Sequence, residues 1–245
     1  MKAALVAFIY CVIHSRWQNA TMNSGPQALQ RIGILGDIHC EHERLATALE
    51  FFKTQNLDLI CAVGDIVDGP GNVNRTIELL LEHQVLCVRG NHERWLFAGE
   101  MRGLDDATSR FDLKLPAWEF LPKLPSLRRL ETVAGRAMLC HGLGTDDMAG
   151  VWPDEDTLKL HSNYALWQLV NQREYEFVIN GHSHQRLVQR FEHLTIINAG
   201  TLYRKHRPCF CIADFATRTV QYFDFTSATE FTPAEQYRLQ TPTAL

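Results

Sequence analysis

The stretch RIGILGDIHCE, residues 31–41, joins an apolar run directly to a group of polar residues. The run over residues 31–36 is typical of a buried β-strand, and it ends in a glycine that permits a tight turn. Asp37 and His39 follow at positions i and i+2, so both side chains can turn to the same face just past the strand. Such groups are costly to bury beside a core unless a cation binds them. We therefore expect this strand to end in two metal ligands.

Four further segments repeat this arrangement of an apolar run followed by polar residues. They are Gly64-Asp65, Gly90-Asn91-His92-Glu93, His141-Gly142 and Gly181-His182-Ser183-His184. The candidate metal ligands of the five segments are Asp37, His39, Asp65, Asn91, His141, His182 and His184. Carboxylate, amide and imidazole groups gathered at strand ends indicate a binuclear metal centre that cleaves phosphoesters.

Hydrolysis of a phosphoester needs hydroxide at neutral pH and positive charge beside the phosphoryl oxygens. Two metal ions about 3.5–4 Å apart can supply both, and they lower the pKa of a bound water towards about 7. A single carboxylate between the ions would hold them at that separation. Asp65 closes the strand next to the first one and is the natural candidate for this bridge.

The other candidate ligands can be divided between the two ions. One ion can take both Asp37 and His39, and Asn91 can give its side-chain oxygen to the other. His182 and His184 again alternate, so each could serve a different ion. His92 is then left beside the centre as a protonated or hydrogen-bonding group.

The first half of the chain alternates strands and helices. Strands are expected at about 31–36, 57–63 and 85–88, and helices at about 41–54 and 73–82. Repeated strand–helix units with short connections imply a largely parallel sheet flanked by helices. The polar segments then lie at the carboxyl ends of the strands, where catalytic loops are expected.

The second half is richer in strands. A hairpin with arms at 129–133 and 136–139 precedes a helix at about 156–172, and strands are expected at 177–180, 186–191, 194–198, 208–215 and 218–225. These strands predict a second sheet packed on the first. The expected fold class is α/β, a four-layer α/β sandwich of two mixed β-sheets flanked by helices. We divide the chain into an extension (1–30), a domain (31–225) with a small insertion at about 94–127, and a C-terminal tail (226–245) without periodicity.

Composition narrows the choice of function. With 245 residues and 46% hydrophobic content, the chain can build one sizeable core. A net charge of −4 gives no sign of a broad nucleic-acid surface. The seven cysteines lie mostly in strand-like runs, which favours reduced thiols and a cytoplasmic location.

The N-terminus is apolar over residues 3–13, which is too short to span a bilayer. It can be a dispensable extension, with translation starting at Met22. It can also be a secretory signal, so secretion stays open, or a structural helix.

The five segments carry the motifs D-x-H, G-D, G-N-H-[DE], G-H and G-H-x-H in this order. In this the chain resembles the calcineurin-like metallophosphoesterase family over about 31–225. The resemblance implies that Asp37, His39 and His184 bind one ion, that Asn91, His141 and His182 bind the other, and that Asp65 bridges them. It also implies that Asn91 and His92 contact the phosphate and that His92 helps to protonate the leaving group. Two divalent ions are implied as cofactors, Mn²⁺ first, with Fe, Zn²⁺ or Ni²⁺ as alternatives.

Residues 197–201, followed by Arg204, are similar to a turn in the small bacterial phosphodiesterase branch of this family, which makes Arg204 a further candidate for phosphate contact. Two positions depart from the family pattern. Cys40 and Glu41 stand where Gly-Asn is frequent, and Gly69 stands where protein phosphatases and symmetrical dinucleoside tetraphosphatases carry a phosphate-clamping arginine. Asp68, beside it, can be a turn residue or can orient a ligand histidine.

The function expected from this resemblance is hydrolysis of a small-molecule phosphoester, as a phosphodiesterase or phosphomonoesterase, by a metal-bridging hydroxide. The alternatives are a phosphoprotein or dinucleoside-polyphosphate phosphatase and a non-catalytic interaction module on the same fold.

Overall fold

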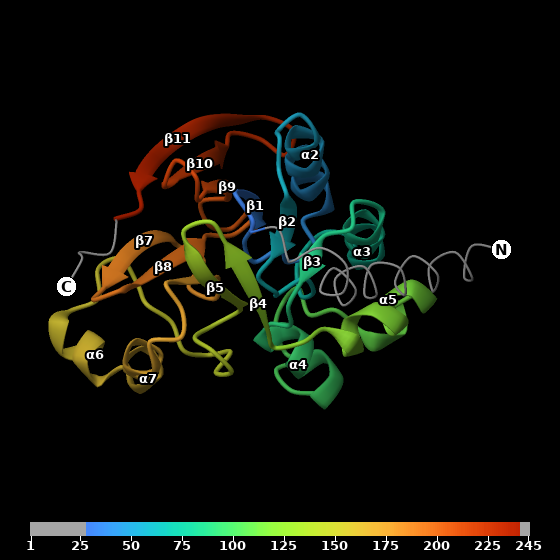
Figure 1. Ribbon diagram of the computed structural model, residues 1–245. Helices are drawn as coiled ribbons and strands as arrows, with labels where there is room; N and C mark the ends of the chain where they lie inside the picture. Colours follow the sequence, from blue (N-terminus) through green and yellow to red (C-terminus); the bar gives the residue numbers. More distant parts are fainter. Residues whose placement is uncertain (1–27, 241–245) are drawn as a thin grey trace, which may run out of the picture.

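A computed structural model describes residues 28–240, and the apolar N-terminal segment lies outside this range. Within it, the strands form two sheets (Figure 1). The first has the order β11-β10-β9-β1-β2-β3. Its members are β1 (Arg31–Leu35), β2 (Leu59–Ala62), β3 (Leu86–Cys87), β9 (Cys209–Asp214), β10 (Thr219–Phe225) and β11 (Phe231–Arg238). The strands β1, β2 and β3 run parallel, and β9 joins the opposite edge of β1 in antiparallel register.

The second sheet has the order β4-β5-β6-β8-β7. Its members are β4 (Leu127–Thr132), β5 (Gly135–Cys140), β6 (Phe177–Asn180), β7 (Arg186–Phe191) and β8 (Leu194–Ala199). The three central strands are parallel, and the two edge strands are antiparallel to their neighbours. Both sheets are therefore mixed, as the sequence predicts.

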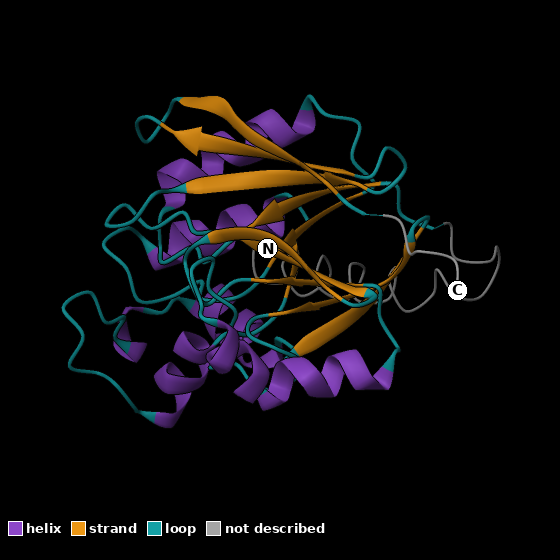
Figure 2. Cartoon of the chain, turned by 90° about the vertical axis from the view of Figure 1, so that its left-hand side faces the viewer, coloured by secondary structure: helices purple, strands orange, loops and turns teal. Residues whose placement is uncertain are grey.

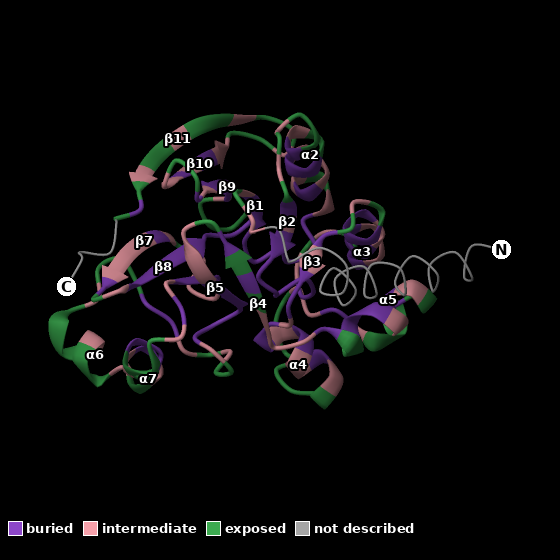
Figure 3. Ribbon diagram, in the orientation of Figure 1, coloured by how far each residue is buried: buried purple, intermediate pink, exposed green. Residues whose placement is uncertain are grey.

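Helices cover the outer faces of both sheets, as Figure 2 shows from the side. The first sheet carries α2 (His42–Lys53) and α3 (Val73–Glu82), with α5 (Leu115–Phe120) packed beside α3, and the second carries α6 (Thr157–Ser162) and α7 (Tyr164–Gln172). The apolar residues form three clusters, one beneath each group of helices and one between the sheets. In β1, Ile32 and Ile34 face the other sheet, whereas Leu35 packs on the helical side. Figure 3 shows that buried residues lie along the central strands of the sheets. The α/β fold with two mixed sheets and flanking helices is confirmed.

The central parallel strands deliver the polar segments to one end of the sandwich. Asp37 follows β1, Asp65 follows β2, and Asn91 begins α4 (Asn91–Ala98) after β3. In the second sheet, His141 directly follows β5 and His182 follows β6. Because carboxyl ends of parallel strands share an edge, five distant parts of the sequence meet there.

Two predictions of regular structure need correction. The expected helix at 156–172 is divided between α6 and α7, because the side chain of Asn163 accepts a hydrogen bond from Leu166 N and caps α7. The tail expected after residue 226 contains β11, which pairs along β10 as an edge strand. Phe231 packs on Phe210 and Phe223, while Pro233 and the exposed polar residues of β11 obscure its strand pattern. No helix within residues 28–240 has the length and apolar character needed to cross a membrane.

A buried tyrosine links the two sheets. The hydroxyl of Tyr222 on β10 donates to the main-chain oxygen of Asn198 on β8 at 2.6 Å and lies 3.3 Å from that of Leu187. Tyr222→Phe should lower the free energy of unfolding by about 1 kcal/mol, because this bond is lost inside the core. Urea denaturation measures the change, with Tyr164→Phe at an exposed position as the control. Equal stability of both variants would show that the hydroxyl does not stabilise the sandwich.

Candidate metal centre

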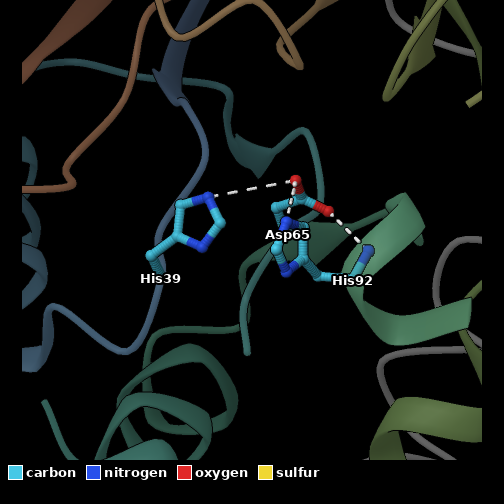
Figure 4. Close-up of side chains that lie close together, drawn as sticks. All are labelled: His39, Asp65 and His92. Atoms are coloured by element: carbon cyan, nitrogen blue, oxygen red, sulfur yellow. Dashed lines mark hydrogen bonds and ion pairs between the residues drawn. The ribbon is translucent and has the colours of Figure 1, made fainter. Parts of the chain in front are cut away.

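The carboxylate of Asp65 lies at the middle of the polar segments. Its Oδ2 atom is 3.2 Å from His141 Nε2, 3.8 Å from His92 Nε2 and 3.9 Å from His39 Nε2. Figure 4 shows His39 and His92 directed at this carboxylate. The donor atoms of Asp37, Asp65 and His141 all lie within 4.8 Å of one another, as do those of His39, Asp65 and His92. Asp65 thus belongs to both groups.

One set of donors gathers on the side of His39. Its Nε2 atom is 3.1 Å from Nε2 of His184. The other ring nitrogen of His39 is 2.7 Å from the main-chain oxygen of Asp68, which can only accept a hydrogen bond. That contact places the proton on Nδ1 and leaves the Nε2 lone pair facing the centre.

A second set gathers around Asn91. Its side-chain oxygen is 2.8 Å from His141 Nε2 and 3.1 Å from His182 Nδ1. His141 Nδ1 is 2.9 Å from the main-chain oxygen of Val63, so this imidazole is also oriented by a backbone acceptor. As with His39, the nitrogen that faces the centre is available as a ligand in the neutral ring.

The electrostatics of this cluster fit a cation. Asp37 and Asp65 are buried, and the ion pairs that they make within the described residues are with histidines. Burial raises the pKa of the Asp37 carboxyl. Burial alone would lower the pKa of His141, but the charges of Asp65 and Asp37 outweigh it and raise that pKa to about 10. The cluster therefore attracts positive charge, and its oxygen and nitrogen donors suit divalent metal ions.

The backbone is unusual at the same residues. His39, Asp65, His182 and His184 all have positive φ angles, of 46°, 47°, 67° and 58°. Residues other than glycine adopt this region infrequently, and such conformations concentrate at functional sites. Tight packing adds to the constraint, because a Cβ atom at Gly90 would lie 2.2 Å from Asp65 Oδ1.

Comparison with known proteins agrees with this geometry. The model of the calcineurin-like phosphoesterase superfamily domain matches residues 31–218. The chain belongs to the calcineurin-like phosphoesterase superfamily. The uncharacterized protein MJ0912 of Methanocaldococcus jannaschii is 36% identical over 62 residues, which make up 25% of this chain and 26% of that protein. The chain therefore spans about a quarter of the length of this curated relative.

Solved structures share the superfamily fold at low identity. A metallophosphoesterase from Sphaerobacter thermophilus has a TM-score of 0.60 at 19% identity, covering 84% of this chain and 88% of that one. YfcE, a phosphoesterase from E. coli, has a TM-score of 0.52 at 16% identity, covering 86% and 100%. Vacuolar Protein Sorting 29 from Cryptosporidium parvum also has a TM-score of 0.52, at 15% identity, covering 86% and 100%. These similar structures include two phosphoesterases and a vacuolar protein sorting protein. The shared fold therefore does not by itself show that this chain catalyses a reaction.

A carboxylate holds the ring of His92, whereas main-chain oxygens hold the rings of His39 and His141. His92 lies on α4, and its Nδ1 is 2.8 Å from Asp68 Oδ2, while its main-chain N–H donates to Asp65 Oδ1 at 3.0 Å. Burial lowers the pKa of His92, but the hydrogen bond to Asp68 and the charge of Asp65 outweigh it and raise that pKa. The carboxylate of Asp68 therefore orients His92, which is not one of the predicted ligands, whereas its main-chain oxygen orients the predicted ligand His39.

The position of Arg204 is set by Glu41. Its Nε and Nη2 atoms donate to the two carboxylate oxygens of Glu41, each at 2.8 Å. Glu41 is buried and also accepts a hydrogen bond from Arg44. Glu41, one of the residues that depart from the family pattern, therefore ties the loop after β8 to the start of α2. Contact of Arg204 with phosphate stays a prediction.

Glu93 is a structural residue that the motif contains but that the sequence analysis assigned no role. Its buried carboxylate accepts hydrogen bonds from four main-chain N–H groups, those of Gly90, Asp65, Ile66 and Val67, at 2.7–3.1 Å. It therefore holds together the turn that carries Asp65 and the turn that carries Asn91. The signal for this role was the acidic residue that ends the G-N-H-[DE] motif.

Glu93→Gln should destabilise the protein, because the new amide group faces main-chain donors that then lose their acceptor. The expected loss in unfolding free energy is about 1–3 kcal/mol for each unpaired group. Thermal and urea unfolding measure it. Glu82→Gln on the exposed face of α3 is the control and should change little. If the two variants were equally stable, the carboxylate would not be holding the turns.

Proposed function

We propose that this protein hydrolyses phosphoesters of small molecules with two divalent cations bound at the end of the sandwich. The observation that carries the proposal is the buried carboxylate of Asp65, which lies between two sets of metal-ligand side chains. Membership of the calcineurin-like phosphoesterase superfamily supports it.

The contacts support a division of the ligands. The approach of His39 to His184 favours one ion held by these two residues and Asp37. The approach of Asn91 to both His141 and His182 favours a second ion held by these three. Asp65 is then the ligand common to both ions. Mn²⁺ is our first choice, and Fe, Zn²⁺ or Ni²⁺ would also suit these nitrogen and oxygen donors.

Two such cations supply charge neutralisation of the phosphoryl oxygens and a water of lowered pKa. The chain itself supplies the remaining functions. His92 is directed into the site by Asp68, and in our proposal it donates a proton from Nε2 to the departing oxygen of the ester. Asn91 and His92 contact the phosphate, with Arg204 as a further candidate.

The rival functions differ in what they require. A phosphoprotein or dinucleoside-polyphosphate phosphatase of the type considered above would use an arginine where this chain has Gly69. A non-catalytic module would need the fold but not His92 in hydrogen-bond contact with Asp68. Within residues 28–240, six buried cysteines have no disulfide partner, which supports a reducing compartment, and we propose the cytoplasm.

Asp65→Asn should abolish hydrolysis and reduce the metal content, because the proposed common ligand loses its charge. His92→Ala should retain the metal but slow hydrolysis of esters with poor leaving groups by about 10²–10⁴-fold. Rates on phenyl and alkyl phosphate mono- and diesters, measured with Mn²⁺-loaded protein, test both expectations. Elemental analysis of each variant gives the metal content.

His161→Ala, at an exposed residue of α6, is the control and should match the wild type. Full activity of Asp65→Asn and His92→Ala on an unactivated ester would refute the assigned roles. Absence of metal-dependent turnover in the wild type on all these esters would instead favour the non-catalytic module.

A further inference from the structure

Arg102 binds the carboxylate of Asp68, which in turn binds His92. Its Nη1 donates to Asp68 Oδ1 at 2.9 Å and its Nη2 donates to Asp68 Oδ2 at 2.7 Å. This two-point contact is the geometry in which a guanidinium and a carboxylate bind most specifically. The Arg102 side chain is only 26% exposed, so the pair is partly shielded from water.

The guanidinium is itself fixed by its own segment. Arg102 Nε donates to the main-chain oxygen of Glu100 at 2.6 Å, and Nη1 lies 3.1 Å from that of Thr108. Thr108 also exchanges two hydrogen bonds with Asp68, from its N–H to Oδ1 at 2.8 Å and from Asp68 N to its hydroxyl at 2.9 Å. Two residues of the segment after α4, Arg102 and Thr108, thus bind the same aspartate.

Counting the bonds at Asp68 shows what Arg102 contributes. Oδ1 accepts from Arg102 and Thr108, and Oδ2 accepts from Arg102 and His92. Without the guanidinium, Oδ1 would keep only Thr108 and Oδ2 only the imidazole, so the carboxylate would be held less firmly. The ring of His92 would then lose the fixed acceptor that aims its Nε2 into the site.

We propose that Arg102 is a positioning residue that orients His92 through Asp68. This inference rests on the function proposed above, in which His92 donates a proton to the leaving group. The inserted segment thus supplies a guanidinium to Asp68 next to Gly69, where other branches of the family place an arginine in the motif. With its two terminal nitrogens on Asp68, Arg102 acts on the histidine and not on the phosphate.

Arg102→Gln should lower kcat for an ester with a poor leaving group by about 10-fold, the size typical of a lost outer partner. The rate for 4-nitrophenyl esters should change far less, because that leaving group needs no proton. KM and metal content should stay as in the wild type. Arg102→Lys keeps the positive charge but loses the two-point contact, so its kcat should lie between those of the wild type and Arg102→Gln. It replaces Arg102→Gln in these measurements if that variant does not fold.

Arg31→Gln is the matched control. Arg31 is 32% exposed and pairs with Asp214 at 3.1 Å, but it begins β1 at the end of the strand opposite Asp37. A second comparison introduces Arg102→Gln into His92→Ala. If Arg102 acts through His92, the second substitution adds no further loss.

One measurement does not depend on turnover. In Zn²⁺-loaded protein, the proton between His92 and Asp68 should give a downfield NMR signal that is absent in His92→Ala. The signal should persist in Arg31→Gln and disappear in Arg102→Gln through exchange with water. Its dependence on Arg102 would support positioning even if the wild type hydrolysed no ester, whereas that inactivity would refute the proposed function.

Three results would overturn the inference. An increase in KM at unchanged kcat would make Arg102 a phosphate contact. Equal losses in the wild-type and His92→Ala backgrounds would make its role merely structural. An unchanged NMR signal with unchanged kcat would show that Asp68 holds His92 without help.

Discussion

The burial of negative charge at the end of the β-sandwich is the constraint on which the site depends. Asp37 and Asp65 are almost fully buried, and histidines are their ion-pair partners within residues 28–240. Removing a charge from water costs several kcal/mol unless a partner compensates it. Divalent cations would provide that compensation and would make the same residues useful for attack on a phosphoester. Stability and function therefore have one electrostatic origin here.

Backbone groups hold the donors in place. Main-chain oxygens of Asp68 and Val63 fix the rings of His39 and His141, so the Nε2 atom of each ring faces the centre. The carboxylate of Glu93 joins two turns through main-chain N–H groups. These supports let several residues keep positive φ angles, a local cost that the surrounding packing offsets.

The sequence predicted most of the fold, because apolar runs and polar strand ends repeat along it. Asp37 and His39 could be recognised from their i, i+2 spacing, and the same spacing allowed His182 and His184 to serve different ions, but which ion each one binds came only from the family resemblance. The contact of Arg102 with Asp68 could not be predicted, since it joins residues 34 positions apart and no periodic pattern encodes it. β11 was missed because Pro233 interrupts its strand pattern.

The most direct test of the account is anomalous diffraction from crystals grown with Mn²⁺. We expect two peaks per chain on either side of the Asp65 carboxylate, one beside His39 and His184 and the other beside Asn91 and His141. A single peak, or peaks away from these side chains, would contradict the claim that the buried carboxylates bind a pair of cations.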